Sequence, residues 1–187
     1  MSKTNQIKRV YQLIIHPNKE WEQILQDVSF HKKGFLLFSV LVVLSAISGV
    51  CGRYLYALNP PVLIDILPEA MASLIVPNIL LYSCAVFIKN LSGRYTKASY
   101  ANSIKLVGYS MIPYLVILVL ILLVRDLYFF GLLGLYSIYI FWTGLSPMLN
   151  FTGAKRTGRV VVVAMLFLLV FFFSELLVRF VVVKIIG

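Results

Sequence analysis

The stretch "LVGYSMIPYLVILVLILLVRDLYFFGLLGLYSIYIFWTGLSPML", from Leu106 to Leu149, decides the fold of this protein. Its only charged residues are Arg125 and Asp126. A hydrocarbon core about 30 Å thick needs roughly 20 helical residues, and this stretch has about twice that number. It must therefore fold back on itself at the charged pair, which predicts a hairpin of two membrane-spanning helices.

The composition of the whole chain agrees with a membrane protein. Of its 187 residues, 60% are hydrophobic and 13% are charged, whereas soluble domains have about 45–50% apolar and about 25% charged residues. The net charge of +10 is divided among short segments between the apolar runs. This distribution is typical of loops that face an anionic leaflet. We expect contact with membrane lipids and no binding of nucleic acid.

The apolar segments predict an all-α fold, a bundle of five transmembrane helices. The predicted spans cover residues 34–56, 70–88, 106–124, 127–149 and 160–186, so that a membrane domain of residues 34–187 follows a cytoplasmic segment of residues 1–33. With the amino terminus inside, thirteen of the 17 Lys and Arg residues lie on the inner side. The positive-inside rule therefore predicts a cytoplasmic amino terminus and an outside carboxyl terminus in the plasma (inner) membrane.

The amino-terminal segment lacks the apolar core of a cleavable signal peptide, so we expect it to remain in the mature protein. In "IKRVYQLIIHPNKEWEQILQDV" apolar residues recur at helical spacing before and after Pro17, which predicts two short amphipathic helices. Pro17 or Asn18 can begin the second helix. Trp21 is of a type that lies at headgroup level. Packing on the bundle and a surface that binds lipids or a protein partner both remain open.

Pro113 lies inside the predicted third span, where a proline removes one backbone hydrogen bond at about 3 kcal/mol in water. Neighbouring helices, hydroxyl groups or water can satisfy the freed carbonyl in a membrane. We therefore expect Pro113 to face other helices and to bend the span. Gly108 and Tyr109 fall on the same side of the helix, which is either a kinked packing face or a substrate-contacting kink.

Polar residues in or beside the spans are candidate functional residues, because such groups are costly to place in lipid. Near the outer interface we expect either structural ion pairs or groups that handle headgroups or ions. The fourth span carries a polar stripe that we expect to face other helices, and the first span carries small residues for contacts in the bundle or a homo-oligomer seam. The charged candidates are Glu175, Arg179, Arg53, Asp65, Glu69, Arg125 and Asp126; the stripe is Tyr128, Gly131, Tyr136, Tyr139, Thr143 and Ser146; the small residues are Ser45, Ser48, Gly49 and Gly52.

Catalysis and cofactor binding have little support in the sequence. No zinc-protease, nucleophile-elbow or phosphate-loop motif occurs. Cys51 and Cys84 lie in separate apolar segments without metal-ligand spacing, so we expect two buried thiols. We predict that the protein is not an enzyme and that it has no metal site and no cofactor.

Two short motifs resemble a known family. Gly108, Tyr109 and Pro113, in the order Gly-Tyr-x-x-x-Pro, resemble the third-span signature of the Yip (Ypt-interacting protein) family. In "HPNKEW", Pro17 and Trp21 resemble the Pro-x-x-x-Trp element that often precedes the first span of bacterial members. The resemblance covers nearly the whole chain and implies five spans with the two termini on opposite sides. The Asp-Leu-Tyr-Gly-Pro element of eukaryotic members, which are associated with Rab GTPases, is missing from the amino-terminal region. The resemblance is therefore to a bacterial-type member, and the missing element puts a Rab GTPase partner in doubt.

Three functions remain open on this basis. The resemblance implies a non-enzymatic protein for membrane organisation, or a trafficking-type adaptor that engages lipids or partner proteins. The polar faces of the third and fourth spans and the outer charged residues would instead suit a small channel, transporter or lipid-moving protein. An enzyme acting on lipid headgroups has the least support, because Glu175 is the only acid inside a predicted span.

Overall fold

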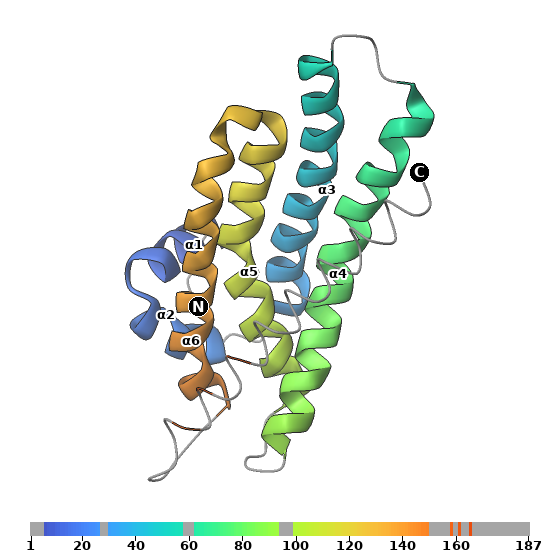
Figure 1. Cartoon of the computed structure of the whole chain (residues 1–187). Helices are drawn as coiled ribbons and strands as arrows, with labels where there is room; N and C mark the ends of the chain where they lie inside the picture. The colour runs from blue at the N-terminus through green and yellow to red at the C-terminus, as the bar shows by residue number, and fades with distance from the viewer. Residues whose placement is uncertain are drawn as a thin grey trace.

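The computed structural model describes residues 6–26, 30–57, 62–93 and 99–149, together with the single residues Gly158, Val161 and Met165. These residues form helices and connections, without a strand among them (Figure 1). In chain order the elements are α1 (Gln6–Ile15), α2 (Pro17–Gln26), α3 (Phe30–Tyr56), α4 (Leu63–Gly93), α5 (Tyr100–Leu123), the 3-10 helix η1 (Arg125–Leu135) and α6 (Tyr136–Leu149).

Four of the described segments are long and apolar enough to cross a membrane. They are Gly34–Tyr56, Ala70–Asn90, Tyr100–Leu123 and Asp126–Leu149. These segments agree with the first four predicted spans in number and nearly in position. The predicted fifth span, residues 160–186, lies outside the described residues and stays a prediction.

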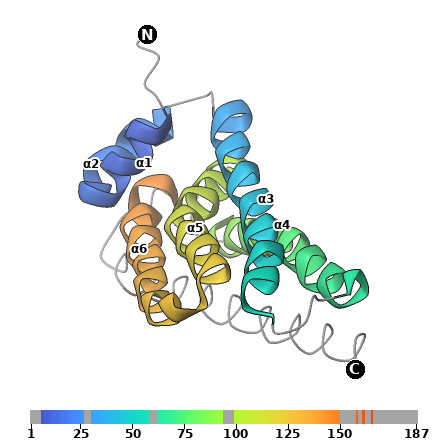
Figure 2. The same cartoon turned by 90° about the horizontal axis from the view of Figure 1, so that it is seen from above.

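The spans run alternately up and down, with α1 and α2 beside α6 (Figure 1). Seen from above, α1 and α2 lie at one side of the bundle and α4 at the other, with α6, α5 and α3 between them (Figure 2). Large apolar side chains are exposed on the outside of the spans, among them Leu36, Val40, Val43 and Ile47 of α3 and Leu67, Met71, Ile75 and Ile79 of α4. An apolar exterior of this kind is what a lipid environment requires.

The chain reverses between α5 and η1, at the predicted position. The Val124 N–H donates to the Leu120 carbonyl at 2.9 Å, and the Leu127 N–H donates to the Val124 carbonyl at 3.1 Å. The returning span begins as a 3-10 helix and becomes α-helical only at Tyr136. We call the end of the bundle at this reversal the hairpin end.

Small residues allow the first and third spans to pack closely. Ser45, Ser48, Gly49 and Gly52 are all buried. A Cβ atom at Gly52 would overlap the backbone carbonyl oxygen of Leu122. The small residues of α3 therefore make contacts inside the bundle, which was one of the two expectations for them.

Pro113 is buried in α5, so the prediction that it faces other helices is confirmed. The next residue bonds to the neighbouring span, since the Tyr114 N–H donates to the Ser137 hydroxyl of α6 at 2.9 Å. One turn earlier, the Ser110 hydroxyl donates to the Leu106 carbonyl at 2.7 Å. The α-helix continues from Tyr100 to Leu123 through the proline, and the predicted bend stays a prediction.

Candidate functional site

Trp21 is the centre of the contact between α2 and the spans. Its side chain is fully buried, with 0% of its surface exposed. The indole Nε1 lies 3.2 Å from the Ile140 carbonyl oxygen and 3.2 Å from the Thr143 hydroxyl oxygen, so its N–H is directed at two acceptors of α6. The ring meets Tyr109 of α5 edge to face, with 6.4 Å between ring centroids. Packing on the bundle, one of the two expectations for this segment, is therefore what the structure shows for Trp21, and its depth relative to the headgroups stays a prediction.

Gly144 provides the space that the indole ring occupies. A Cβ atom at this position would lie 2.5 Å from Cε2 and 2.7 Å from Cζ2 of Trp21, and 2.6 Å from Cδ1 of Leu106. Real Cβ atoms essentially never come this close to another atom. Any side chain larger than hydrogen at this position would push α2 away from α5 and α6.

Two side chains from the spans bind backbone carbonyl groups in the last turns of α1 and α2. The Tyr136 hydroxyl donates to the Ile14 carbonyl in the last turn of α1 at 2.6 Å. The buried Lys105 ammonium donates to the Ile24 carbonyl in the last turn of α2 at 3.4 Å. Carbonyl groups in the last turn have no partner inside their own helix, and a cation is favourable there. Both helices are thus tied to the bundle at their carboxyl ends.

A buried ion pair joins α1 to α2. The Arg9 Nε and the Glu20 Oε1 are 4.0 Å apart, and the Glu20 side chain is almost fully buried. Burial raises the pKa of Glu20 above its ordinary value of 4.5, while the positive charge of Arg9 acts in the opposite direction. Among the described residues the Glu20 Oε1 accepts no hydrogen bond. Burial therefore disfavours the ionised form of Glu20 more than the neighbouring Arg9 favours it.

The two quoted motifs meet in space. Pro17 begins α2, Trp21 follows one turn later, and the indole contacts Tyr109 of the Gly-Tyr-x-x-x-Pro segment. Gly108 and Pro113 are buried in the same helix. Sequence reasoning did not single out Lys105, Gly144 or Glu20 for this site. A lysine next to an apolar run and a glycine inside a span were the available signals.

The prediction that the polar stripe of the fourth span faces other helices is wrong for Tyr128 and Tyr139, which are 76% and 48% exposed, and for the exposed Gly131. Tyr136, Thr143 and Ser146 are half-buried, and the first two bind α1 and α2. The predicted stripe assumes 100 degrees per residue, but a 3-10 helix has about 3.0 residues per turn, so the stripe does not continue through η1, where Tyr128 and Gly131 lie.

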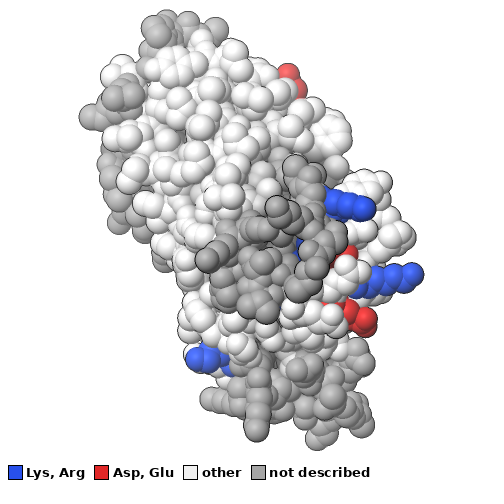
Figure 3. Space-filling model, turned by 180° about the vertical axis from the view of Figure 1, so that it is seen from behind, with Lys and Arg blue, Asp and Glu red and all other residues white. Residues whose placement is uncertain are grey.

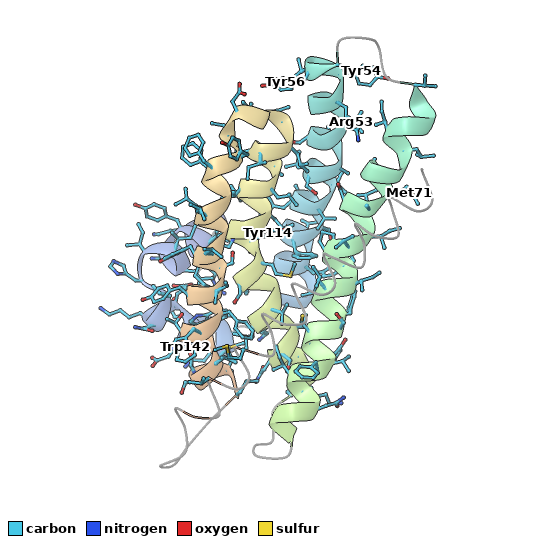
Figure 4. All side chains as sticks on the ribbon, viewed as in Figure 1. Arg53, Tyr54, Tyr56, Met71, Tyr114 and Trp142 are labelled. Carbon is cyan, nitrogen blue, oxygen red and sulfur yellow. The ribbon has the colours of Figure 1, made fainter. Side chains whose placement is uncertain are left out.

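The charged candidates are only partly described. Arg53 is half-buried and lies near the hairpin end of the bundle (Figure 4). Asp126 is exposed, at the start of η1. Glu175 and Arg179 lie outside the described residues, and the structure describes no side chains for Asp65, Glu69 and Arg125. The outer group of charges stays a prediction.

The two cysteines differ from each other. Cys84 is buried as expected, but Cys51 is exposed on α3, so the expectation of two buried thiols is wrong for Cys51. Both thiols are free. Among the residues that the structure describes, no group of three or more His, Cys, Asp or Glu residues is placed to hold a metal ion.

The four apolar spans and the docked amino-terminal helices define the class: a multi-pass α-helical membrane protein. Comparison with known families gives the particular group. The family model described as the Yip1 domain matches residues 11–174. The chain therefore belongs to the Yip1 domain family. No curated protein matches the chain, and no solved structure does.

Proposed function

We propose that this protein is a non-enzymatic membrane-organising or adaptor protein of the Yip family, which engages lipids and a protein partner through α1 and α2. The observation that carries the proposal is the complete burial of Trp21 between α5 and α6. A helix anchored in this way presents a fixed outer surface, and a preorganised surface binds without the entropy cost of ordering a free segment.

The outer face of α2 suits a protein partner in water. Its exposed side chains are amides and charges of both signs, namely Asn18, Lys19, Glu22, Gln23 and Gln26. Seen from behind, most of the described surface is uncharged; charged atoms of both signs lie along the right side, and a further basic group lies at the lower left (Figure 3). Groups of this kind give an interface orientation and specificity.

We further propose the full arrangement of a bacterial-type member: five spans in the plasma (inner) membrane, with residues 1–33 cytoplasmic, residues 34–187 as the membrane domain and the carboxyl terminus outside. Alkaline phosphatase is active only outside the cytoplasm. Fused after Gly187 in a bacterial host it should be active, and fused near Ser92 it should be inactive. The reverse pattern would contradict the proposed orientation.

Site-specific photo-crosslinking in whole cells tests the adaptor role. A photoreactive amino acid at Gln23, on the outer face of α2, should give one discrete protein adduct. The same amino acid at Val40, an exposed apolar position of α3, is the matched control and should give none. The Gln23 adduct should disappear when Trp21→Ala releases α2 from the bundle. No adduct at Gln23, or transport by reconstituted vesicles that depends on Tyr109 or Glu175, would contradict the proposal.

A further inference from the structure

The outer face of α4 carries two polar side chains among apolar ones. In chain order this face consists of Met71, Ile75, Asn78, Tyr82 and Val86, which share one side of the helix at about 100 degrees per residue. Asn78 is half-buried, Tyr82 is 44% exposed, and the three apolar members are exposed. Seen from above, α4 lies at one side of the described bundle (Figure 2). The two polar groups are therefore directed at the surroundings of the bundle and not at its core.

Both polar groups lie at the level of the membrane interior. The membrane-spanning part of α4 is Ala70–Asn90, and Asn78 is about 12 Å from one end of it and about 18 Å from the other at the helical rise. Tyr82 is about 12 Å from Asn90. Its side chain leans toward the amino terminus of α4, as helical side chains do, and so toward the level of Asn78. Neither group is close to water or to headgroups at either boundary.

The described helices leave part of the hydrogen-bonding capacity of these two groups unused. The Asn78 Nδ2 donates to the Leu74 carbonyl at 2.8 Å, which uses one of its two N–H groups. Within the described part of the chain the amide makes no other hydrogen bond, and the Tyr82 hydroxyl makes none. Ser83 differs, because its hydroxyl donates to the Leu80 carbonyl at 3.3 Å inside α4. Lipid tails offer no partner, so an amide oxygen and a hydroxyl on an outer face are costly unless another helix covers them.

A second copy of the chain supplies the missing partners by symmetry. All copies in one membrane have the same orientation, so a two-fold axis along the membrane normal places Asn78 and Tyr82 at the same depth in both copies. The two groups are complementary, since the hydroxyl is a donor and the amide oxygen is an acceptor. The predicted fifth span is a poorer match. Counted from Val160, it would bring residues 168–173 to this depth, and all six are apolar.

We propose that α4 is the interface of a homodimer in the membrane, in which the Tyr82 hydroxyl of each copy donates to the Asn78 amide oxygen of the other. Two equivalent hydrogen bonds then lie around the two-fold axis. Met71, Ile75 and Val86 extend the contact along the helix. A polar residue in an apolar seam fixes the register of paired helices, and Asn78 does so here. The dimer goes beyond the proposed function and does not depend on it, because α1 and α2 lie at the other side of the bundle (Figure 2).

Disulfide crosslinking in membranes tests the dimer on the full chain. The native thiols are removed as Cys51→Ser and Cys84→Ala, and a single cysteine is introduced as Ile75→Cys, which leaves both polar groups in place. The matched control is Leu44→Cys, at an exposed apolar position near the middle of the first span, on α3. Oxidation with copper phenanthroline should link Ile75→Cys into a species of twice the chain mass of 21.2 kDa. The control should give several-fold less of this species.

A second measurement tests the hydrogen bonds themselves. Copies labelled with a donor or an acceptor dye at the amino terminus are mixed in phosphatidylcholine vesicles, and energy transfer gives the dissociation constant of the dimer. Asn78→Leu combined with Tyr82→Phe should raise this constant about tenfold. A tenfold change corresponds to about 1.4 kcal/mol, or about 0.7 kcal/mol for each of two hydrogen bonds between helices. Leu44→Ile, at the control position, should leave the constant unchanged.

Three results would overturn the dimer. Equal linking of Ile75→Cys and Leu44→Cys would show random collision, and an unchanged dissociation constant for the double variant would remove the role of the polar groups. A photoreactive amino acid at Tyr82 should form an adduct with a second copy. An adduct within the same chain would show that the fifth predicted span covers α4, and an adduct with a different protein would also contradict the dimer. A single symmetric size-exclusion peak checks that each variant folds.

Discussion

Replacing Gly144 with alanine tests the docking of α2 at its tightest contact. In an ordinary helix interior this change stabilises by about 1 kcal/mol, because glycine is the more flexible residue. Here the structure predicts the opposite sign. The new Cβ atom would lie 2.5–2.7 Å from atoms of Trp21 and Leu106, both of which are fully buried.

The magnitude for docking follows from the overlap alone, because α6 is helical whether or not α2 is docked and the helix-propensity gain cancels between the two states. Overpacking a buried contact costs about 1–3 kcal/mol. The overlap with Trp21 is relieved by undocking and the overlap with Leu106 of α5 is not, which places the loss of docking free energy near the middle of this range, at about 2 kcal/mol. Since about 1.4 kcal/mol corresponds to a factor of ten, the fraction of molecules with α2 undocked should rise about 30-fold.

Limited proteolysis measures this fraction directly. Trypsin cuts after exposed Lys19 of α2 only when the helix is released, so the initial rate of this cleavage should rise with the undocked fraction. The matched control is Gly49→Ala, also in a span, where the new Cβ atom would meet only Cδ1 of Leu122 at 3.9 Å. The control should cleave at the wild-type rate or more slowly.

A double substitution separates the specific clash from a general effect on α6. Trp21→Leu removes the indole atoms nearest Gly144, so Gly144→Ala should be less harmful in that background, with a coupling energy of about 1 kcal/mol or more. If Gly144→Ala behaved like Gly49→Ala, or if the two substitutions were additive, the packing argument would be refuted.

Three further substitutions test other contacts. Ser137→Ala should lower the free energy of unfolding by about 1 kcal/mol, because the hydrogen bond from the Tyr114 N–H to the Ser137 hydroxyl is lost, and Ser137→Thr should recover part of the loss in denaturation assays. Gly52→Ala should destabilise more than Gly144→Ala, since its Cβ atom would overlap the Leu122 backbone, which cannot rotate away; an equal or higher melting temperature would contradict this. Glu20 has a raised pKa in the folded protein, so its contribution to stability is fully present below the ordinary value of 4.5 and is lost as pH rises through the folded-state value. Glu20→Gln should remove that pH dependence of the melting temperature, and an unchanged profile would show that Glu20 is not its source.

The spans could be predicted from the sequence because a hydrocarbon core imposes length and apolarity on any helix that crosses it. The first span matches Gly34–Tyr56 at both ends, and the hairpin at Arg125 and Asp126 follows from an apolar run too long for one crossing. The motif residues Tyr109 and Trp21 were also found, since their order along the chain resembles a known family. These inferences depend on local composition and spacing.

The docking site could not be predicted in the same way. Trp21 has the composition signals of an interfacial residue, and nothing near it in the chain shows that Gly144 and Thr143 offer a space and an acceptor. The polar stripe failed for a related reason, because local sequence did not reveal that η1 is a 3-10 helix.

The sequence by itself determined the solvent of this protein, the positions of four described spans and the point at which the chain reverses, because each follows from the cost of placing polar groups in lipid. The tertiary structure alone decided that Trp21 turns inward, that Lys105 and Tyr136 complete the ends of α2 and α1, and that α1 keeps apolar side chains on its outer face. Those features depend on which residues from distant segments meet, and close packing settles that only when the helices are assembled.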